Sequence, residues 1–104
     1  MYRKTLPQRR LSMTSDMTHG SLRFQVSIGY YDGDCKDPAE VFVSGTKVGS
    51  DVDATTRDGS VLLSLALQYG VPVEVMAGAI TRGGSGEPST IIGSVLDRLL
   101  KDRA

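Results

Sequence analysis

The sequence predicts a small α+β domain, in which an antiparallel β-hairpin or small sheet packs against two or three helices. Two observations predict this class. Apolar and polar residues alternate over residues 21–31, as in a strand with one buried face. Apolar residues recur at helical spacing in two later segments, residues 51–69 and 89–100. With 104 residues, of which 39% are hydrophobic and 23% charged, the protein is long enough for one core, and we expect a single domain.

The first expected strand covers residues 21–31. Its apolar residues occupy every second position: Leu22, Phe24, Val26, Ile28 and Tyr30. Asp32 and Gly33 follow and suit a turn with positive φ. Because β-branched and aromatic residues return over residues 39–44, we expect a second strand there and therefore a β-hairpin.

A long helix is expected to begin at Gly49-Ser50, since a serine hydroxyl can accept a free N–H of the first turn. The apolar residues that we expect to face the core are Val61, Leu62, Leu65, Ala66 and Tyr69. Gly70 suits the left-handed residue that ends a helix. Gly59 lies inside the helix, so either the helix bends there or a neighbouring backbone comes close.

Two shorter elements complete the expected fold. Pro72 can open a short helix, and residues 81–88 form a glycine-rich link. Ser89 is the expected cap of a last amphipathic helix. We interpret the glycine-rich link as a turn rather than as a phosphate-binding loop, because the Lys-Ser/Thr pair of such a loop is missing.

Residues 1–20 are interpreted as a basic N-terminal arm that leaves room for a first strand, and residues 21–104 as the domain itself. The arm supplies the candidate contacts with a phosphate or a partner protein: Arg3, Lys4, Arg9 and Arg10. We expect a partner surface that combines Arg9, Arg10 and the exposed ends of the hairpin, since folding alone gives these arginines no visible role. The formal net charge of zero argues against nucleic acid as the ligand.

No catalytic residues, metal ligands or cofactor are expected. His19, the single histidine, is interpreted as a surface residue in a turn, and Cys35 as an inert exposed thiol. Asp32, Asp34 and Asp37 lack the spacing of a calcium-binding loop. One cysteine forms neither an internal disulfide nor a thiolate zinc site. With no secretory signal and no stretch long enough to cross a bilayer, we expect a cytoplasmic protein that does not contact a membrane.

Several segments together resemble the TSCPD domain, which occurs near the C-terminus of adenosylcobalamin-dependent (class II) ribonucleotide reductases. The most specific segment is Ser64-Leu-Ala-Leu-Gln-Tyr-Gly-Val-Pro72. The other similar segments are residues 6–10, 26–33, 39–43 and 88–99. The resemblance implies a small α+β domain related to these reductases. Their radical cysteine, redox cysteine pair, cobalamin site and substrate site belong to another domain, and we expect none of them in this protein.

The resemblance leaves the role open. Our first hypothesis is a stand-alone accessory module that binds a ribonucleotide reductase, another protein of nucleotide metabolism or a nucleotide. The second is a nucleotide or nucleic-acid binder that uses the basic arm, with Tyr30 or Tyr31 available for stacking on bases. The third is a ribonucleoside-diphosphate reductase, for which a protein with Cys35 alone has no cysteine pair. Homo-oligomers are also expected, because a hairpin leaves an open sheet edge.

Overall fold

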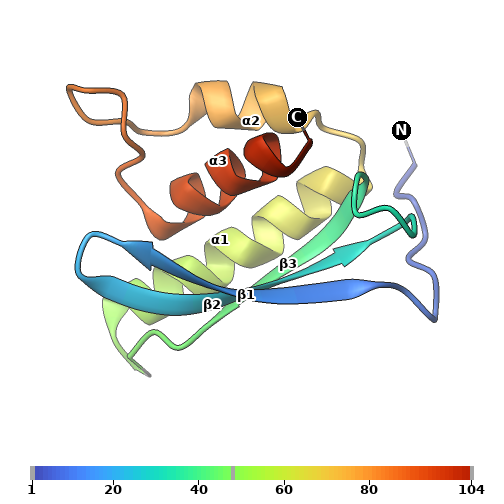
Figure 1. Cartoon of the computed structure of the whole chain (residues 1–104), viewed down its shortest axis with the longest axis horizontal. Helices are drawn as coiled ribbons and strands as arrows, with labels where there is room; N and C mark the ends of the chain where they lie inside the picture. Colours follow the sequence, from blue (N-terminus) through green and yellow to red (C-terminus); the bar gives the residue numbers. More distant parts are fainter. Residues whose placement is uncertain (1, 48, 104) are drawn as a thin grey trace.

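The computed structural model describes residues 2–47 and 49–103, and these residues contain three strands and three helices (Figure 1). The strands are β1 (Ser12–His19), β2 (Leu22–Tyr30) and β3 (Pro38–Ser44). The helices are α1 (Asp51–Gln68), α2 (Val73–Ala79) and α3 (Ile91–Arg103). The strands form one antiparallel sheet in the order β1-β2-β3. The predicted α+β class is therefore confirmed.

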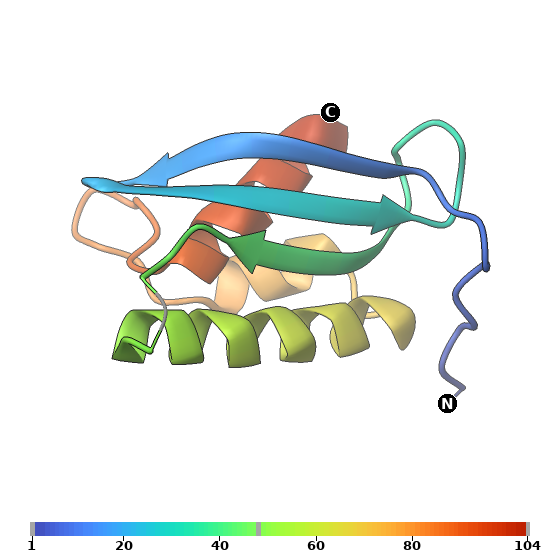
Figure 2. The ribbon, with the colours of Figure 1, turned by 90° about the horizontal axis from the view of Figure 1, so that it is seen from below.

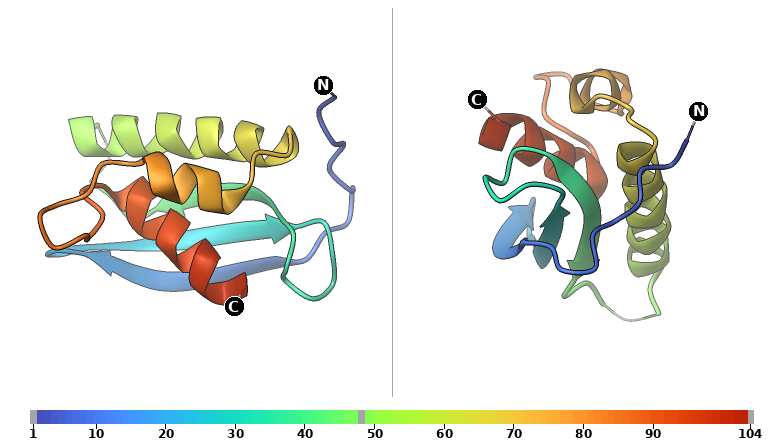
Figure 3. Two further views of the ribbon diagram at one scale, coloured as in Figure 1. Left: turned by 90° about the horizontal axis from the view of Figure 1, so that it is seen from above. Right: turned by 90° about the vertical axis from the view of Figure 1, so that its right-hand side faces the viewer.

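α3 lies behind the strands, α1 runs along the outer edge of β3, and the face of the sheet toward the viewer is open (Figure 2). Seen along the strands, α3 lies over β1 and β2 while α1 runs beside β3 (Figure 3, right). The core between these layers takes its side chains from every element except β1. They are Phe24, Val26, Ile28, Tyr30, Val41, Leu63, Leu67, Val73, Ala77, Ile91, Val95, Leu96 and Leu99. The alternation of β2 was thus interpreted correctly from Phe24 onward, while Leu22 lies largely exposed.

β1 falls within the segment that was expected to be a basic arm with room for a first strand. Its eight residues pair in continuous register with β2, from Ser12 opposite Gly29 to His19 opposite Leu22. Gly20, with φ of 59°, occupies the two-residue turn that joins them, as a primed hairpin turn requires. His19 is therefore the last residue of a strand and only borders the turn.

The loop between β2 and β3 differs from the expectation in two ways. The residue with positive φ is Cys35, at 57°, and not Gly33. The Asp32 carboxylate holds this conformation by accepting hydrogen bonds from the backbone N–H groups of Lys36 and Asp37. Cys35 is half-buried and packs against the core, so the prediction of an exposed thiol was wrong.

The helix termini mostly follow the sequence signals. Ser50 caps α1, its hydroxyl accepting from Asp53 N–H at 3.1 Å, and Gly70 adopts the predicted positive φ of 83°. The cap of α3 is Thr90, whose hydroxyl accepts from Gly93 N–H at 3.0 Å, rather than Ser89. At Gly59 a neighbouring side chain, rather than a neighbouring backbone, comes close. A Cβ there would lie 2.7 Å from the side chain of Ile92 at the start of α3.

The predicted core face of α1 was wrong. Val61, Leu62 and Tyr69 remain 58%, 67% and 41% exposed. The helix instead buries a stripe that is partly polar: Thr56, Ser60, Leu63, Leu67 and Gln68. The physical reason is that α1 packs against the edge of β3, whose backbone groups need polar partners.

Candidate binding surface

Gln68, at the C-terminal end of α1, connects three parts of the protein. It is 4% exposed, and its side-chain amide donates to the backbone carbonyl oxygen of Ala39 in β3 at 3.1 Å. Its side-chain oxygen accepts from Arg3 Nε at 2.6 Å, and its backbone carbonyl oxygen accepts from the N–H of Lys4 at 2.8 Å. Two of these hydrogen bonds satisfy the buried side chain of Gln68, and together the three hold both β3 and the N-terminal segment (residues 2–11) against α1.

Ser64 lies one helical turn before Gln68 and contacts the same strand. Its hydroxyl accepts from Val41 N–H at 2.9 Å and is placed to donate to the Val41 carbonyl oxygen at 3.2 Å. Val41 is opposite Ile28 in the β2–β3 ladder and turns its backbone groups away from β2. Ser64 and Gln68 therefore take the place of a further strand along the outer edge of β3.

The N-terminal segment is held against the domain by its basic residues. Lys4 Nζ lies 3.2 Å from an Asp37 carboxylate oxygen and 4.0 Å from the centre of the Tyr31 ring. The Tyr31 hydroxyl donates to the Lys4 carbonyl oxygen at 3.0 Å. These contacts, with those of Gln68, order the first part of the segment.

Arg10 forms an ion pair with Glu40, whose side chain is 9% exposed on the open face of β3. The hydrogen bond to Glu40 raises the pKa of the Arg10 guanidinium above its usual range, so the arginine stays charged. Gly29 lies beside Glu40 in the ladder and leaves the space for its side chain, because a Cβ on Gly29 would lie 2.7 Å from the carboxylate. The N-terminal segment thus crosses the end of the sheet from β1 to α1 (Figure 3, right).

The four basic residues of the predicted contact surface have different surroundings. Arg3, Lys4 and Arg10 each form a hydrogen bond within the domain, and they bind acceptors in three different parts of it. Among the described residues, Arg9 is the member of the basic set for which no partner is found. The structure gives Arg10 a folding role that the sequence did not show, since it pairs with the buried Glu40.

A groove opens between the N-terminal segment, the open face of β3 and α1, with a volume of about 530 Å³. Its lining residues are Arg3, Leu6, Glu40, Val41, Phe42, Val43, Arg57, Ser60, Val61, Ser64, Leu65 and Gln68. Phe42 of β3 and Val61 of α1 both line the groove and are 60% and 58% exposed. Arg3 and Arg57 add positive charge and Glu40 adds negative charge, and Arg57 also lies 3.5 Å from Asp53. Large apolar side chains left in water at a concave surface are typical of a protein-binding site.

Another hollow, of about 640 Å³, lies near the β1–β2 hairpin. Its lining residues are Asp16, Met17, Thr18, Arg23, Phe24, Gln25 and Gly45. Phe24 is 3% exposed and belongs to the core. This hollow therefore lacks the exposed apolar anchors of the groove.

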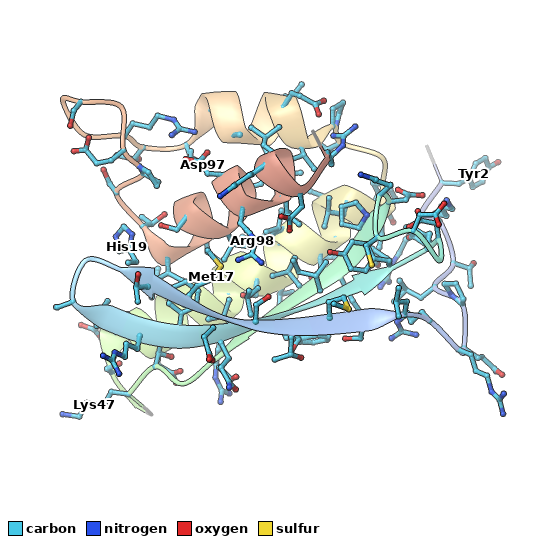
Figure 4. All side chains as sticks on the ribbon, in the orientation of Figure 1. Tyr2, Met17, His19, Lys47, Asp97 and Arg98 are labelled. Carbon is cyan, nitrogen blue, oxygen red and sulfur yellow. The ribbon has the colours of Figure 1, made fainter. Side chains whose placement is uncertain are left out.

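The remaining candidate residues do not form a catalytic cluster in the described parts of the protein. His19 points from the end of β1 toward the start of α3, where its Nδ1 makes a 2.8 Å hydrogen bond with Ser94 Oγ (Figure 4). Within residues 2–47 and 49–103, no group of three or more His, Cys, Asp or Glu side chains is arranged to hold a metal ion. Over the same ranges, each helix is too short or too polar to cross a membrane.

The sequence contained signals for the features that were missed. Ser60, Ser64 and Gln68 recur every four residues, so they mark a polar stripe that continues through the apolar second half of the helix. Phe42 shares its strand face with Glu40 and Ser44 by the alternation of β3, which predicts its exposure. The contacts of the N-terminal segment had no such signal, because their acceptors lie far away in the sequence.

These observations can be set beside known proteins. The model of the TSCPD domain matches residues 1–102. The chain belongs to the TSCPD domain family. It is also 35% identical over 75 residues to a vitamin B12-dependent ribonucleotide reductase of Rhodopirellula baltica. That match covers 71% of the present sequence and 7% of the reductase, so this TSCPD protein corresponds to a small part of that relative.

The family resemblance found in the sequence is thereby confirmed. No solved structure matches this TSCPD protein. The segment from Ser64 to Pro72, the most specific part of the resemblance, contains the two side chains that cover the edge of β3. The segment that most resembles the family therefore has a structural role in this protein.

Proposed function

We propose that this TSCPD protein is a non-catalytic accessory module that works in the cytoplasm by binding a protein of the ribonucleotide reductase system. The observation that carries the proposal is the groove between β3 and α1, which is lined by the exposed Phe42 and Val61 together with Arg3 and Arg57. Relation to a vitamin B12-dependent ribonucleotide reductase supports a reductase as the partner. The single cysteine supports a role without catalysis, because Cys35 alone cannot form a redox pair.

The groove indicates the chemistry of the bound segment. An apolar group would contact Phe42 and Val61, and a carboxylate would meet Arg3 or Arg57. Arg3 uses its Nε atom on Gln68, which leaves its terminal nitrogens for an acceptor. We therefore expect a reductase segment that carries an aromatic or aliphatic anchor next to an acidic residue.

Phosphate binding by the basic arm has less support. Three of its four candidate residues already bind acceptors within the protein, and these acceptors lie in three different places, so the residues do not converge on one phosphate. Nucleotide binding that weakens steeply between low and moderate salt would favour this alternative over the groove.

A binding titration against a purified vitamin B12-dependent ribonucleotide reductase tests the proposal. We expect saturable binding and a loss of affinity of about tenfold in Val61→Ala, because that side chain lines the groove. Val75→Ala is the matched control, since Val75 is a helical valine of α2 with 60% exposure outside the groove. It should bind like the unchanged protein.

Two outcomes would overturn the proposal. Absence of binding at protein concentrations near 100 µM would remove the reductase as the partner. Equal losses in Val61→Ala and Val75→Ala, with unchanged thermal stability, would remove the groove as the binding surface. Phe42→Ala is a second variant for the binding titration. Its ring is 60% exposed and contributes little to the core, so the variant should still fold.

A further inference from the structure

β1 is the strand at the other edge of the sheet, and its outward backbone groups can be identified. Tyr30 N–H donates to the Leu11 carbonyl oxygen at 2.9 Å, and antiparallel pairs alternate between bonded and non-bonded. The odd-numbered residues of β1 therefore bond to β2. The even-numbered residues direct their N–H and C=O groups away from the sheet: Ser12, Thr14, Asp16 and Thr18.

These outward groups find no backbone partner among residues 2–47 and 49–103. β1 also has few of the features by which proteins protect an edge strand. From Ser12 to His19 it contains neither proline nor lysine, its register with β2 has no bulge, and Asp16 is its one acidic residue. On β3, by contrast, Ser64 and Gln68 bind the outward groups of Val41 and Ala39.

We propose that two copies of this protein pair through antiparallel β1 strands and form one continuous six-stranded sheet. The strand is self-complementary when Ser15 lies on the two-fold axis. Thr14 is then opposite Asp16 of the second copy, and Ser12 is opposite Thr18. In this register every outward N–H and C=O of the four even-numbered residues gains a partner.

The side chains agree with this register. On the helix side of the sheet, Met13 would lie opposite Met17 of the second copy. Met13 is 51% exposed although it pairs with the buried Ile28, so the dimer would cover an apolar residue that the monomer leaves in water. Figure 4 shows Met17 between β1 and α3.

The charged groups near the axis do not oppose the pairing. Asp16 of one copy lies opposite Thr14 of the other copy, not opposite the other Asp16. Within its own copy, Asp16 accepts a hydrogen bond from Gln25 at 3.2 Å. From α3, Arg98 Nη2 lies 3.4 Å from Ser15 Oγ, and Arg98 is paired with Asp102 at 3.2 Å. Each copy thus brings a neutral ion pair to the axis.

Sedimentation equilibrium tests the dimer. We expect the full-length protein to dimerise at micromolar concentration, and Thr14→Pro to raise the dissociation constant at least about 100-fold, because proline removes an outward N–H. The proline should leave the β1–β2 ladder intact, since Thr14 N–H does not bond to β2. Thr14→Ala is the matched control and should dimerise normally. A protein that stays monomeric at about 100 µM would overturn the proposal, as would an undiminished dimer in Thr14→Pro.

Cysteine cross-linking tests the register without relying on a proline. In a Cys35→Ser background, Ser15→Cys should form a disulfide-linked dimer under mild oxidation, because facing residues of a non-bonded pair have Cα atoms about 4.5 Å apart. Ser12→Cys should not cross-link, since the two positions would be roughly 20 Å apart along the strands. Cross-linking through Ser12→Cys, or none through Ser15→Cys, would contradict this register. The groove and its reductase test are unaffected by either result.

Discussion

The two edges of the sheet differ in the hydrogen-bond partners of their outward backbone groups. Along β3, Ser64 and Gln68 of α1 supply hydrogen bonds to Val41 and Ala39, so side chains of a helix replace a neighbouring strand. Along β1, the outward groups of the even-numbered residues have no backbone partner among the described residues. The part of the β3 edge at Ala39 and Val41 is thus covered within the protein, and we propose that a second copy covers the edge of β1.

This difference explains the orientation of α1. A helix that places Ser64 and Gln68 on a strand edge must turn another face to solvent, and that face carries Val61, Leu62 and Tyr69. The covered edge of β3 and the exposed apolar groove are therefore two results of one helix rotation. Substitutions of Ser64 and Gln68 test whether their hydrogen bonds to β3 hold α1 in place, or whether its apolar contacts alone do so.

The largest effect is expected from Gln68→Met. Methionine has a similar size but leaves the Ala39 carbonyl oxygen and Arg3 without their hydrogen bonds, so the free energy of unfolding should fall by about 2–4 kcal/mol. Urea denaturation measures the change. Gln8→Met is the matched control at an exposed glutamine and should stay within about 0.5 kcal/mol. Equal effects in both variants would show that Gln68 does not hold the edge.

A smaller effect is expected from Ser64→Ala, which removes the partner of both backbone groups of Val41. The free energy of unfolding should fall by about 1–2 kcal/mol. Ser60→Ala is the same change one helical turn earlier, where the hydroxyl bonds back to the Thr56 carbonyl oxygen of its own helix. That bond adds little to a helix, and we expect a change near zero. If urea denaturation shows Ser60→Ala to be as destabilising as Ser64→Ala, the loss belongs to packing in α1 and not to the edge of β3.

Much of the fold followed from local patterns. Alternation identified β2, β-branched and aromatic residues identified β3, and cap residues placed both ends of α1 at Ser50 and Gly70. The TSCPD resemblance was also carried by short continuous segments, of which Ser64 to Pro72 is the most specific. These features depend on residues that are close in the sequence, so they can be derived without a structure.

The rotation of α1 and the contacts of the N-terminal segment could not be derived in this way. Helical periodicity ranks side chains by hydropathy, and it favoured Val61 and Leu62 over Ser64 and Gln68 as the buried face. Only the position of β3 shows that its edge requires hydrogen-bonding partners. In the same way, no local pattern pairs Arg10 with Glu40, because the two residues are far apart in the sequence and only the fold brings them together.

Amide hydrogen exchange at single residues, followed by NMR at low and high protein concentration, tests the contrast between the two edges most directly. The account predicts that Val41 N–H is protected at both concentrations, because Ser64 binds it within the same molecule. Thr14 N–H should exchange rapidly in dilute protein and become protected when copies pair. Rapid exchange of Val41 under both conditions would contradict the closure of the β3 edge by α1. Protection of Thr14 in dilute protein would contradict the open edge of β1.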